Sequence, residues 1–331
     1  MKGWKGARVL VTGAGGFIGS HLTEELAGQG AKVRALVRYN SRSHWGFLEE
    51  LPRELAPRVE VTAGDVCDPF CVMDLAKDQE VVFHLAALIA IPYSYQAPAG
   101  YVAANVTGTL NVLEACRRRG VRKLVHTSTS ETYGTARYAP IDEEHPLQGQ
   151  SPYSASKIAA DKLVESYHRS FDLPAATVRP FNTYGPRQSA RAVLPAVISQ
   201  VCAGRKVLDL GDLRPVRDFN YVSDTVAGFL AAAASPKSVG EVINIGSGRA
   251  VSIGQAARAV LRLTGRRLPV REDSRRLRPP KSEVFRLLCD NRKARRLLGW
   301  RPRVPLEEGL ERTIAYVRAH PGRYKADLYN V

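Results

Sequence analysis

The sequence predicts an α/β protein in which a doubly wound parallel sheet carries a smaller, discontinuous α/β lobe. Three observations predict this fold. An apolar strand near the N-terminus runs into a glycine loop and a helix, strands and helical patterns then alternate, and the alternation loosens after about residue 180. In sheets of this kind, ligands bind beyond the carboxyl ends of the strands.

The first βαβ unit is predicted over residues 7–37, as a strand, a glycine loop, an amphipathic helix and a second strand. Gly13, Gly16 and Gly19 form the pattern G-x-x-G-x-x-G directly between strand and helix. Glycines at these positions permit a tight turn, the close approach of a pyrophosphate and close helix packing. In this context the pattern predicts a dinucleotide-binding site.

The same alternation continues through the first half of the chain. Strands are predicted at 59–64, 80–87, 122–128 and 174–180, and helices at about 101–119 and 152–171. This order predicts a parallel Rossmann sheet. Asp65 and Val66 directly follow the third strand and are candidates to flank the adenine of the dinucleotide.

The end of the second strand departs from the usual NAD fingerprint. An acidic residue there normally receives the ribose hydroxyls of the adenosine, but this chain has Arg38, followed by Ser41, Arg42 and Ser43. Cations and hydroxyls suit a 2′-phosphate. The cofactor is therefore predicted to be NAD(P), with NADP favoured, unless these arginines point to solvent.

The composition is typical of a globular protein. The 331 residues, 44% of them hydrophobic, suffice for one large domain or two ordinary ones. No segment approaches the roughly 18 uninterrupted apolar residues of a membrane span, so we expect a cytoplasmic protein without membrane contact. The cysteines lack a C-x-x-C pair and a nearby histidine cluster, which predicts reduced thiols and no metal site. They are Cys67, Cys71, Cys116, Cys202 and Cys289.

Positive charge is concentrated near the C-terminus. The net charge is +16, and residues 258–303 hold sixteen lysines and arginines against four acids. Clustered cations favour polyanions such as nucleic acid or a membrane surface, but this segment lacks the interleaved aromatic residues of a single-strand binder. We favour a solvated surface with a few arginines facing a small anionic ligand, and we expect no nucleic-acid partner.

Two further motifs predict catalytic groups. The octet TSTSETYG (127–134) follows an apolar strand, and its Glu131 adds a base that simple hydride transfer does not require. Tyr153 and Lys157 lie four residues apart at the start of a predicted helix, hence on one face. A tyrosine base at neutral pH needs its pKa lowered by about three units, or about 4 kcal/mol, which a nearby ammonium and a cationic nicotinamide could supply.

Together these motifs resemble the extended short-chain dehydrogenase/reductase superfamily, specifically the nucleotide-sugar epimerases and dehydratases. The segments TGAGGFIG, HLAA, TSTSETYG, YSASK, RPFNTYGPRQ, RDFNYV and RRLLGW occur in the family's order. The triplet Thr129-Ser130-Glu131 is similar to that of 4,6-dehydratases. The segments YNSRSHWGFLEELP, LIAIPYSY and YKADLYNV resemble the dehydratases of legionaminic-acid-type pathways, which act on nucleotide-linked N-acetylglucosamine.

The resemblance implies a mechanism. Tyr153 takes the proton from O4 of the sugar while hydride leaves C4, and the resulting ketone acidifies the hydrogen on C5. Glu131 then removes that proton, water leaves from C6, and hydride returns to C6. Thr129 would hydrogen-bond the O4 region, and Lys157 would hold the cofactor ribose. Ser130 stands where other dehydratases have an acid, so Glu131 or a water is left to protonate the leaving hydroxyl.

The resemblance also implies the binding residues and the domain organisation. Residues 1–180 are expected to form the cofactor-binding domain, to which later segments return, and 181–331 mainly the nucleotide-sugar-binding lobe. A homodimer is expected, with GDP and UDP both open as the nucleotide. The cofactor set adds Phe17, Ile18, Leu85, Ala86 and Ala87. The substrate set is Asn182, Arg217 and Arg278 for the sugar diphosphate, Val193 and Leu194 for the base, Glu283 for a ribose hydroxyl, and Arg187 without an assigned group.

Two alternative functions stay open at this point. A 4-epimerase would use the same cofactor, Tyr153 and Lys157, but would have no use for Glu131. A non-catalytic, nucleotide-sensing or RNA-binding member of the superfamily would explain the positive charge. Such a member should have lost the tyrosine, the lysine or the acid, and all three are present.

Overall fold

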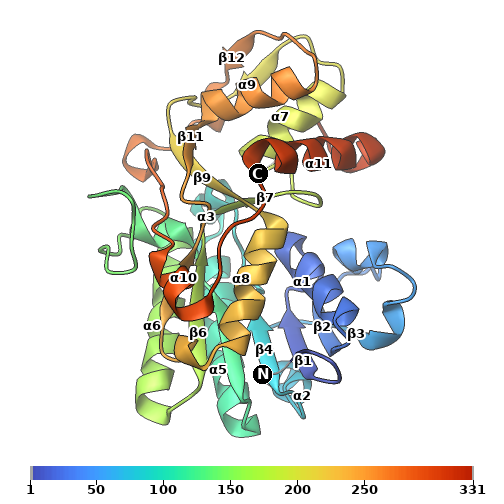
Figure 1. Cartoon of the computed structure of the whole chain (residues 1–331), viewed down its shortest axis with the longest axis vertical. Helices are drawn as coiled ribbons and strands as arrows, with labels where there is room; N and C mark the ends of the chain where they lie inside the picture. The colour runs from blue at the N-terminus through green and yellow to red at the C-terminus, as the bar shows by residue number, and fades with distance from the viewer. Residues whose placement is uncertain (1–2, 330–331) are drawn as a thin grey trace.

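Seven parallel strands form the central sheet, in the order β10-β6-β5-β4-β1-β2-β3 (Figure 1). The structure, a computed structural model, describes residues 3–329. The strands are β1 (Arg8–Thr12), β2 (Lys32–Arg38), β3 (Val59–Gly64), β4 (Val81–His84), β5 (Lys123–Thr127), β6 (Ala175–Pro180) and β10 (Val242–Ile245). The predicted doubly wound parallel sheet is confirmed.

Helices cover both faces of this sheet. One face carries α1 (Phe17–Gly28) and α8 (Val222–Ala234), and the other carries α2 (Pro69–Leu75), α5 (Gly108–Arg119) and α6 (Pro152–Phe171). Successive side chains of a strand point to opposite faces, so Val9 and Val11 join the core under α1 while Leu10 joins the core under α5. This double burial explains why the strands are continuous apolar runs.

The smaller lobe stands where the sheet's strands end (Figure 1). Its helices are α7 (Val193–Cys202), α9 (Ile253–Leu263) and α11 (Leu306–Ala319). Its strands are β7 (Asn182–Tyr184), β9 (Val216–Tyr221) and β11 (Ala250–Ser252) in one small sheet, and β8 (Leu208–Leu210) with β12 (Val270–Glu272) in another. Leu194, Ile253 and Ile314 of the lobe share one hydrophobic core with the α1 face of the large sheet. The domain boundary at residue 180 stays a prediction.

The remaining α-helices of residues 3–329 are α3 (Ile91–Gln96), α4 (Pro98–Tyr101) and α10 (Arg292–Leu298). Within residues 3–329, no helix is long and apolar enough to cross a membrane. The same residues include no group of three His, Cys, Asp or Glu side chains that could hold a metal ion. All five cysteines are free thiols.

A buried carboxylate anchors β9 to its surroundings. Asp218 is fully buried and accepts hydrogen bonds from the backbone N–H groups of Ser247, Gly248 and Cys289, and from the Ser247 hydroxyl, at 2.6–3.1 Å. The loop after β10 and the segment before α10 are thereby tied to the strand. Since Arg217 is the preceding residue of β9, this anchor also fixes the backbone of a predicted substrate-binding residue.

Two predicted elements differ from the structure for identifiable reasons. The helix predicted at 101–119 is interrupted by a π-helical turn at Val102–Thr107, where the Asn105 side chain bonds the backbone of Leu88 and the hydroxyl of Ser156. The strand predicted at 80–87 ends at His84. Beyond it, Leu85 N donates to both the carbonyl and the hydroxyl oxygen of Thr12, and Ala86 N donates to the hydroxyl oxygen alone.

Candidate active site

The glycine loop between β1 and α1 packs against the chain that follows β4. Gly13 has a φ of 71°, and a Cβ on it would lie 2.8 Å from the backbone nitrogen of Ala86. A Cβ on Gly19 would overlap the Gly13 carbonyl oxygen. Helix α1 follows the N-cap residue Gly16 and has no capping side chain and no acid in its first turn, which leaves backbone N–H groups for an anion. The loop therefore fits the pyrophosphate of a dinucleotide. The other predicted cofactor-binding residues near the glycine loop are half-buried, namely Phe17, Ile18, Leu85 and Ala87.

The segment after β2 folds back towards the glycine loop. The Asn40 side chain accepts the backbone N–H groups of residues 42 and 44, and Phe47 N donates to Gly15 O at 2.9 Å. Arg38, Ser41 and Arg42 are exposed on this segment. Their side chains are thus available to a ligand beside the loop.

The predicted adenine residues lie close to Arg38. Asp65 accepts a hydrogen bond from Cys67 N, and the guanidinium of Arg38 acts on the pKa of the Cys67 thiol, which burial raises to about 11. Val66 is buried against Gly108 of α5. The structure therefore brings Arg38 to the same corner as Asp65 and Val66.

Helix α6 begins in a way that fixes the two predicted catalytic residues. Ser151 and Ser154 form a capping box, which satisfies the first free N–H groups of the helix. Tyr153 and Lys157 follow one turn apart, and only 7% and 4% of their surfaces are exposed. Their side chains therefore face the interior of the site.

Burial shifts both groups away from their charged forms. It raises the pKa of Tyr153 well above the usual range for a tyrosine, although a hydrogen bond with Thr129 opposes the shift and the nearby Glu131 carboxylate adds to it. Burial lowers the pKa of Lys157 to about 8, and the Asp161 carboxylate opposes this shift. Ser130 is buried at the start of the 3-10 turn that contains Glu131. A bound cation next to Tyr153 would favour its phenolate.

Four alternating charges lie directly beside this pair. Arg278 Nη1 is 3.6 Å from Glu131 Oε2, and Arg278 Nε is 4.0 Å from Glu283 Oε2. Arg217 Nη2 is 3.0 Å from Glu283 Oε1. Burial lowers the pKa of Arg217, whereas Glu131 and Glu283 overcome burial at Arg278 and raise its pKa. The predicted C5 base thus lies among three predicted substrate-binding residues.

Two predicted substrate-binding residues have a buried polar atom without a hydrogen bond among residues 3–329. Arg278 Nη1 and Asn182 Oδ1 form no hydrogen bond there, and such groups normally find one. The segment that carries Arg278 is held over the site by a shared hydrogen bond of 2.6 Å between Tyr95 and Ser282, and by Ser282 Oγ donating to Gln150 O. A donor and an acceptor are therefore available to a polar ligand.

Three predicted substrate residues lie elsewhere. Arg187 is buried and pairs with Glu24 of α1 at 2.8 Å and with Glu50 at 3.4 Å, so it ties the lobe to the cofactor half. Leu194 is 1% exposed within the hydrophobic core, and Val193 is half-buried at the first residue of α7. The structure does not bring these three together with the four charges.

Sequence reasoning missed the buried polar residues behind Lys157. His84 and His126 are register partners at the ends of β4 and β5, and their rings are 5.6 Å apart. Asp161, one turn after Lys157, lies between His126 and Arg179. The position of Asp161 four residues beyond Lys157 was the available signal.

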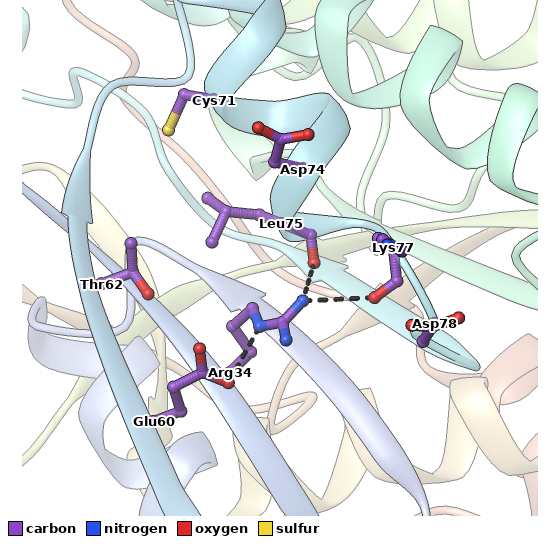
Figure 2. A pocket seen from close by; sticks show the side chains of 8 residues that line it. All are labelled: Arg34, Glu60, Thr62, Cys71, Asp74, Leu75, Lys77 and Asp78. Atoms are coloured by element: carbon purple, nitrogen blue, oxygen red, sulfur yellow. Dashed lines mark hydrogen bonds and ion pairs between the residues drawn. The ribbon is translucent and has the colours of Figure 1, made fainter.

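An open groove of about 560 Å³ lies away from this site (Figure 2). Its lining comes from β2, β3, α2 and the turn after α2. Arg34 crosses it and already binds Glu60 and the carbonyl oxygens of Leu75 and Lys77. None of the candidate site residues lines this groove, so we assign it no part in the chemistry.

Known proteins match the chain along nearly its whole length. The family described as GDP-mannose 4,6 dehydratase matches residues 10–313. A UDP-glucose 4-epimerase from Mycolicibacterium smegmatis is 36% identical, and the match covers 94% of this chain and 98% of that protein. A dTDP-glucose 4,6-dehydratase from an Actinoplanes species is 33% identical, and the match covers 95% of this chain and 98% of that protein. The solved dTDP-glucose 4,6-dehydratase of Streptomyces venezuelae, with NAD and TYD bound, has a TM-score of 0.87 at 30% identity, covering 96% of this chain and 99% of that one.

The chain therefore belongs to this family of extended short-chain dehydrogenases/reductases, which are NAD-dependent enzymes that modify nucleotide sugars. The family-level resemblance predicted from the motifs is confirmed. Both 4,6-dehydratases and 4-epimerases occur among the relatives, so the reaction depends on the site residues.

The buried histidine predicts a pH dependence of stability. Burial lowers the pKa of His126 to about 4, against an ordinary value of 6.5. Between these values the unfolded chain binds a proton that the folded chain does not, so stability falls as pH decreases from 6.5 towards 4. We expect His126→Gln to remove up to about 1.4 kcal/mol per pH unit from that slope, measured by urea unfolding at pH 7, 6 and 5.

Ser199→Ala is the control, because it removes a buried hydroxyl and no titratable group. It should change stability equally at each pH and leave the slope as in the wild type. A His126→Gln protein with an unchanged slope between pH 6.5 and 5 would contradict the buried, neutral state of His126.

Proposed function

We propose that the chain is a nucleotide-sugar 4,6-dehydratase acting on GDP- or UDP-linked N-acetylglucosamine. The observation that carries this proposal is the position of Glu131, which acts electrostatically on Tyr153 and lies 3.6 Å from Arg278. Elimination across C5 and C6 requires a second base next to the tyrosine base, and the Glu131 carboxylate is such a base. Dehydratases among the relatives, at 33% identity, support the reading.

Each residue then has a defined proton to move or hold. Tyr153 accepts the proton of O4, Thr129 hydrogen-bonds that oxygen, and Lys157 stabilises the phenolate. Glu131 removes the proton from C5 once C4 is a ketone. The same carboxyl group then protonates the C6 hydroxyl, which leaves as water, because the Ser130 hydroxyl is too weak an acid. When C6 is reduced, a proton that comes from solvent is added at C5, and the O4 proton passes from Tyr153 to solvent. NAD, when bound, supplies the oxidation at C4 and the later reduction at C6.

The four charges explain how the substrate could engage the base. A diphosphate attracts guanidinium groups more strongly than a single carboxylate does, because it offers several charged acceptors. Binding at Arg217 and Arg278 would therefore draw Arg278 away from Glu131 and leave that carboxylate free to act as a base. Asn182 and Glu283 would hold the neighbouring polar groups of the sugar nucleotide. We also propose a homodimer, in line with the family resemblance.

The second candidate is a 4-epimerase. It is favoured by the relative from Mycolicibacterium smegmatis, at 36% identity. An epimerase would use Tyr153 and Lys157 in the same way, but it would return the hydrogen to C4 and leave C5 and C6 unchanged. Replacement of Glu131 therefore distinguishes the two functions experimentally.

Replacement of the carboxylate tests the proposal directly. Glu131→Gln keeps the size of the side chain but removes the basic oxygen, so oxidation at C4 should proceed while elimination stops. We expect reduced nicotinamide to accumulate with a 4-keto-6-hydroxy sugar, and net turnover to fall by about 10²–10⁴-fold. Absorbance at the nicotinamide band and mass spectrometry of the sugar nucleotide measure the two effects.

Tyr153→Phe is the control for this experiment. It should suppress even the first oxidation, because no group then takes the proton of O4. If Glu131→Gln turned over at a rate close to that of the wild type, another group would be the C5 base and the dehydratase assignment would lose its main support.

The cofactor preference forms a separate part of the proposal. Arg38 and Arg42 are exposed beside the glycine loop, where they could bind a 2′-phosphate. Their replacement by Ala should weaken NADP by about 1–3 kcal/mol, the scale of a lost charged hydrogen bond, and leave NAD unaffected. Calorimetric titration of both cofactors measures this, with Lys32→Ala as the control on the same strand. Equal weakening of both cofactors would show that these arginines do not read the 2′-phosphate.

A further inference from the structure

We propose that the buried ion pair between Asp161 and Arg179 is a positioning element for the reaction. It aligns the segment that carries Thr129 and Glu131 with the helix that carries Tyr153 and Lys157. The inference concerns the oxidation at C4, which both candidate functions share, and so it stands whichever product is formed.

The acidic partner, Asp161, binds the beginning of the octet. Asp161 is 4% exposed on α6, one turn after Lys157. Its Oδ2 accepts a hydrogen bond of 2.6 Å from the hydroxyl of Ser128, the residue before Thr129. The same oxygen accepts Arg179 Nη2 at 2.9 Å and Nε at 3.2 Å. One carboxylate oxygen therefore joins three elements, namely α6, β6 and the end of β5.

The basic partner, Arg179, binds the other end of the octet. Arg179 Nη1 donates to the Tyr133 hydroxyl at 3.1 Å, and the guanidinium carbon lies 4.9 Å from the centre of the Tyr133 ring. Tyr133 in turn donates to Asn244 Oδ1 of β10 at 2.7 Å. Since Tyr133 lies two residues after Glu131, the two charges of one ion pair hold the octet on both sides of its reactive residues.

Stability alone does not account for such a pair. Taking two charges out of water costs more than their attraction commonly returns, and apolar residues of the same volume often stabilise a fold equally well or better. A pair of charges, however, fixes direction, because each hydrogen bond requires a particular distance and angle. The pair is thus better suited to orienting the octet than to stabilising the sheet.

The Asp161 carboxylate also acts electrostatically on the Lys157 ammonium. The titratable groups around Lys157 are Asp161 and Tyr153 on its own helix, His84 from β4 and His126 from β5, with Arg179 from β6 behind Asp161. Burial lowers the pKa of both histidines, so both are neutral at pH 7. Asp161 is accordingly the anion that favours the charged form of Lys157, and its loss should let Lys157 lose its proton at lower pH.

The test compares variants that loosen the octet with variants that only remove a charge. Ser128→Ala removes the hydrogen bond from the octet to Asp161, and Tyr133→Phe removes the hydrogen bond from Arg179 to the octet. Both variants leave the ion pair in place. Asp161→Asn removes the carboxylate. The double variant Asp161→Asn/Arg179→Met removes both charges of the ion pair, so that Arg179 is not left buried without its partner. Ser199→Ala is the matched control, because this buried serine of α7 bonds only within its own helix.

The rate of nicotinamide reduction in a single turnover is the main readout. The full-length protein loaded with NAD is mixed with UDP-N-acetylglucosamine or, as a second probe, UDP-glucose. We expect each octet variant to be about 10-fold slower and the double variant about 100-fold slower, the scale of a misplaced reacting group. The NAD dissociation constant from calorimetry and the melting temperature of the double variant should stay close to those of the wild type. For Asp161→Asn, the alkaline limb of the rate profile should move to lower pH.

Two results would overturn the inference. One is a double variant that reduces nicotinamide at a rate within twofold of the wild type. The other is a loss of rate in Ser199→Ala equal to that in Ser128→Ala, because the octet contact would then have no particular effect. Failure of the dehydratase proposal is a different observation, since it appears in the sugar product and not in the rate of nicotinamide reduction.

Discussion

The parallel arrangement of the strands is the constraint on which the rest of the structure depends. Because β1, β4, β5 and β6 all run in one direction, their carboxyl ends meet at one edge of the sheet. The glycine loop, the octet and the start of the lobe all leave from that edge. Residues that lie more than a hundred positions apart in the chain, such as Glu131 and Arg278, are thereby brought within 3.6 Å.

Several charged side chains of the site are buried. Lys157, Asp161, Arg179 and Arg217 are each no more than 5% exposed, and such groups require partners. In the described chain Asp161 Oδ2 accepts hydrogen bonds from Ser128 and Arg179, whereas Asp161 Oδ1, Asn182 Oδ1 and Arg278 Nη1 are buried without a hydrogen bond. Asn182 and Arg278 are residues assigned to the substrate, so a polar ligand could complete their hydrogen bonds on binding.

Much of this arrangement could be predicted from the sequence. The glycine spacing, the apolar strands and the Tyr153–Lys157 spacing follow from local rules, and the structure has them where predicted. The π-helical turn at Asn105 could not be predicted, because its hydrogen bonds reach Leu88 and Ser156, which are distant in sequence. Arg187 was assigned to the substrate from its motif, but its partners Glu24 and Glu50 come from another part of the fold. The pairing of Glu131 with Arg278 depends likewise on tertiary structure.

We propose above that Glu131 serves elimination across C5 and C6. The most direct measurement is mass spectrometry and NMR of the product formed by the wild-type protein in deuterated water, from GDP- and UDP-linked N-acetylglucosamine, glucose and mannose. We expect the loss of one water from an N-acetylglucosamine nucleotide, with deuterium at C5 of the product. An isomer of unchanged mass without deuterium at C5, as the sole product, would contradict it and identify a 4-epimerase.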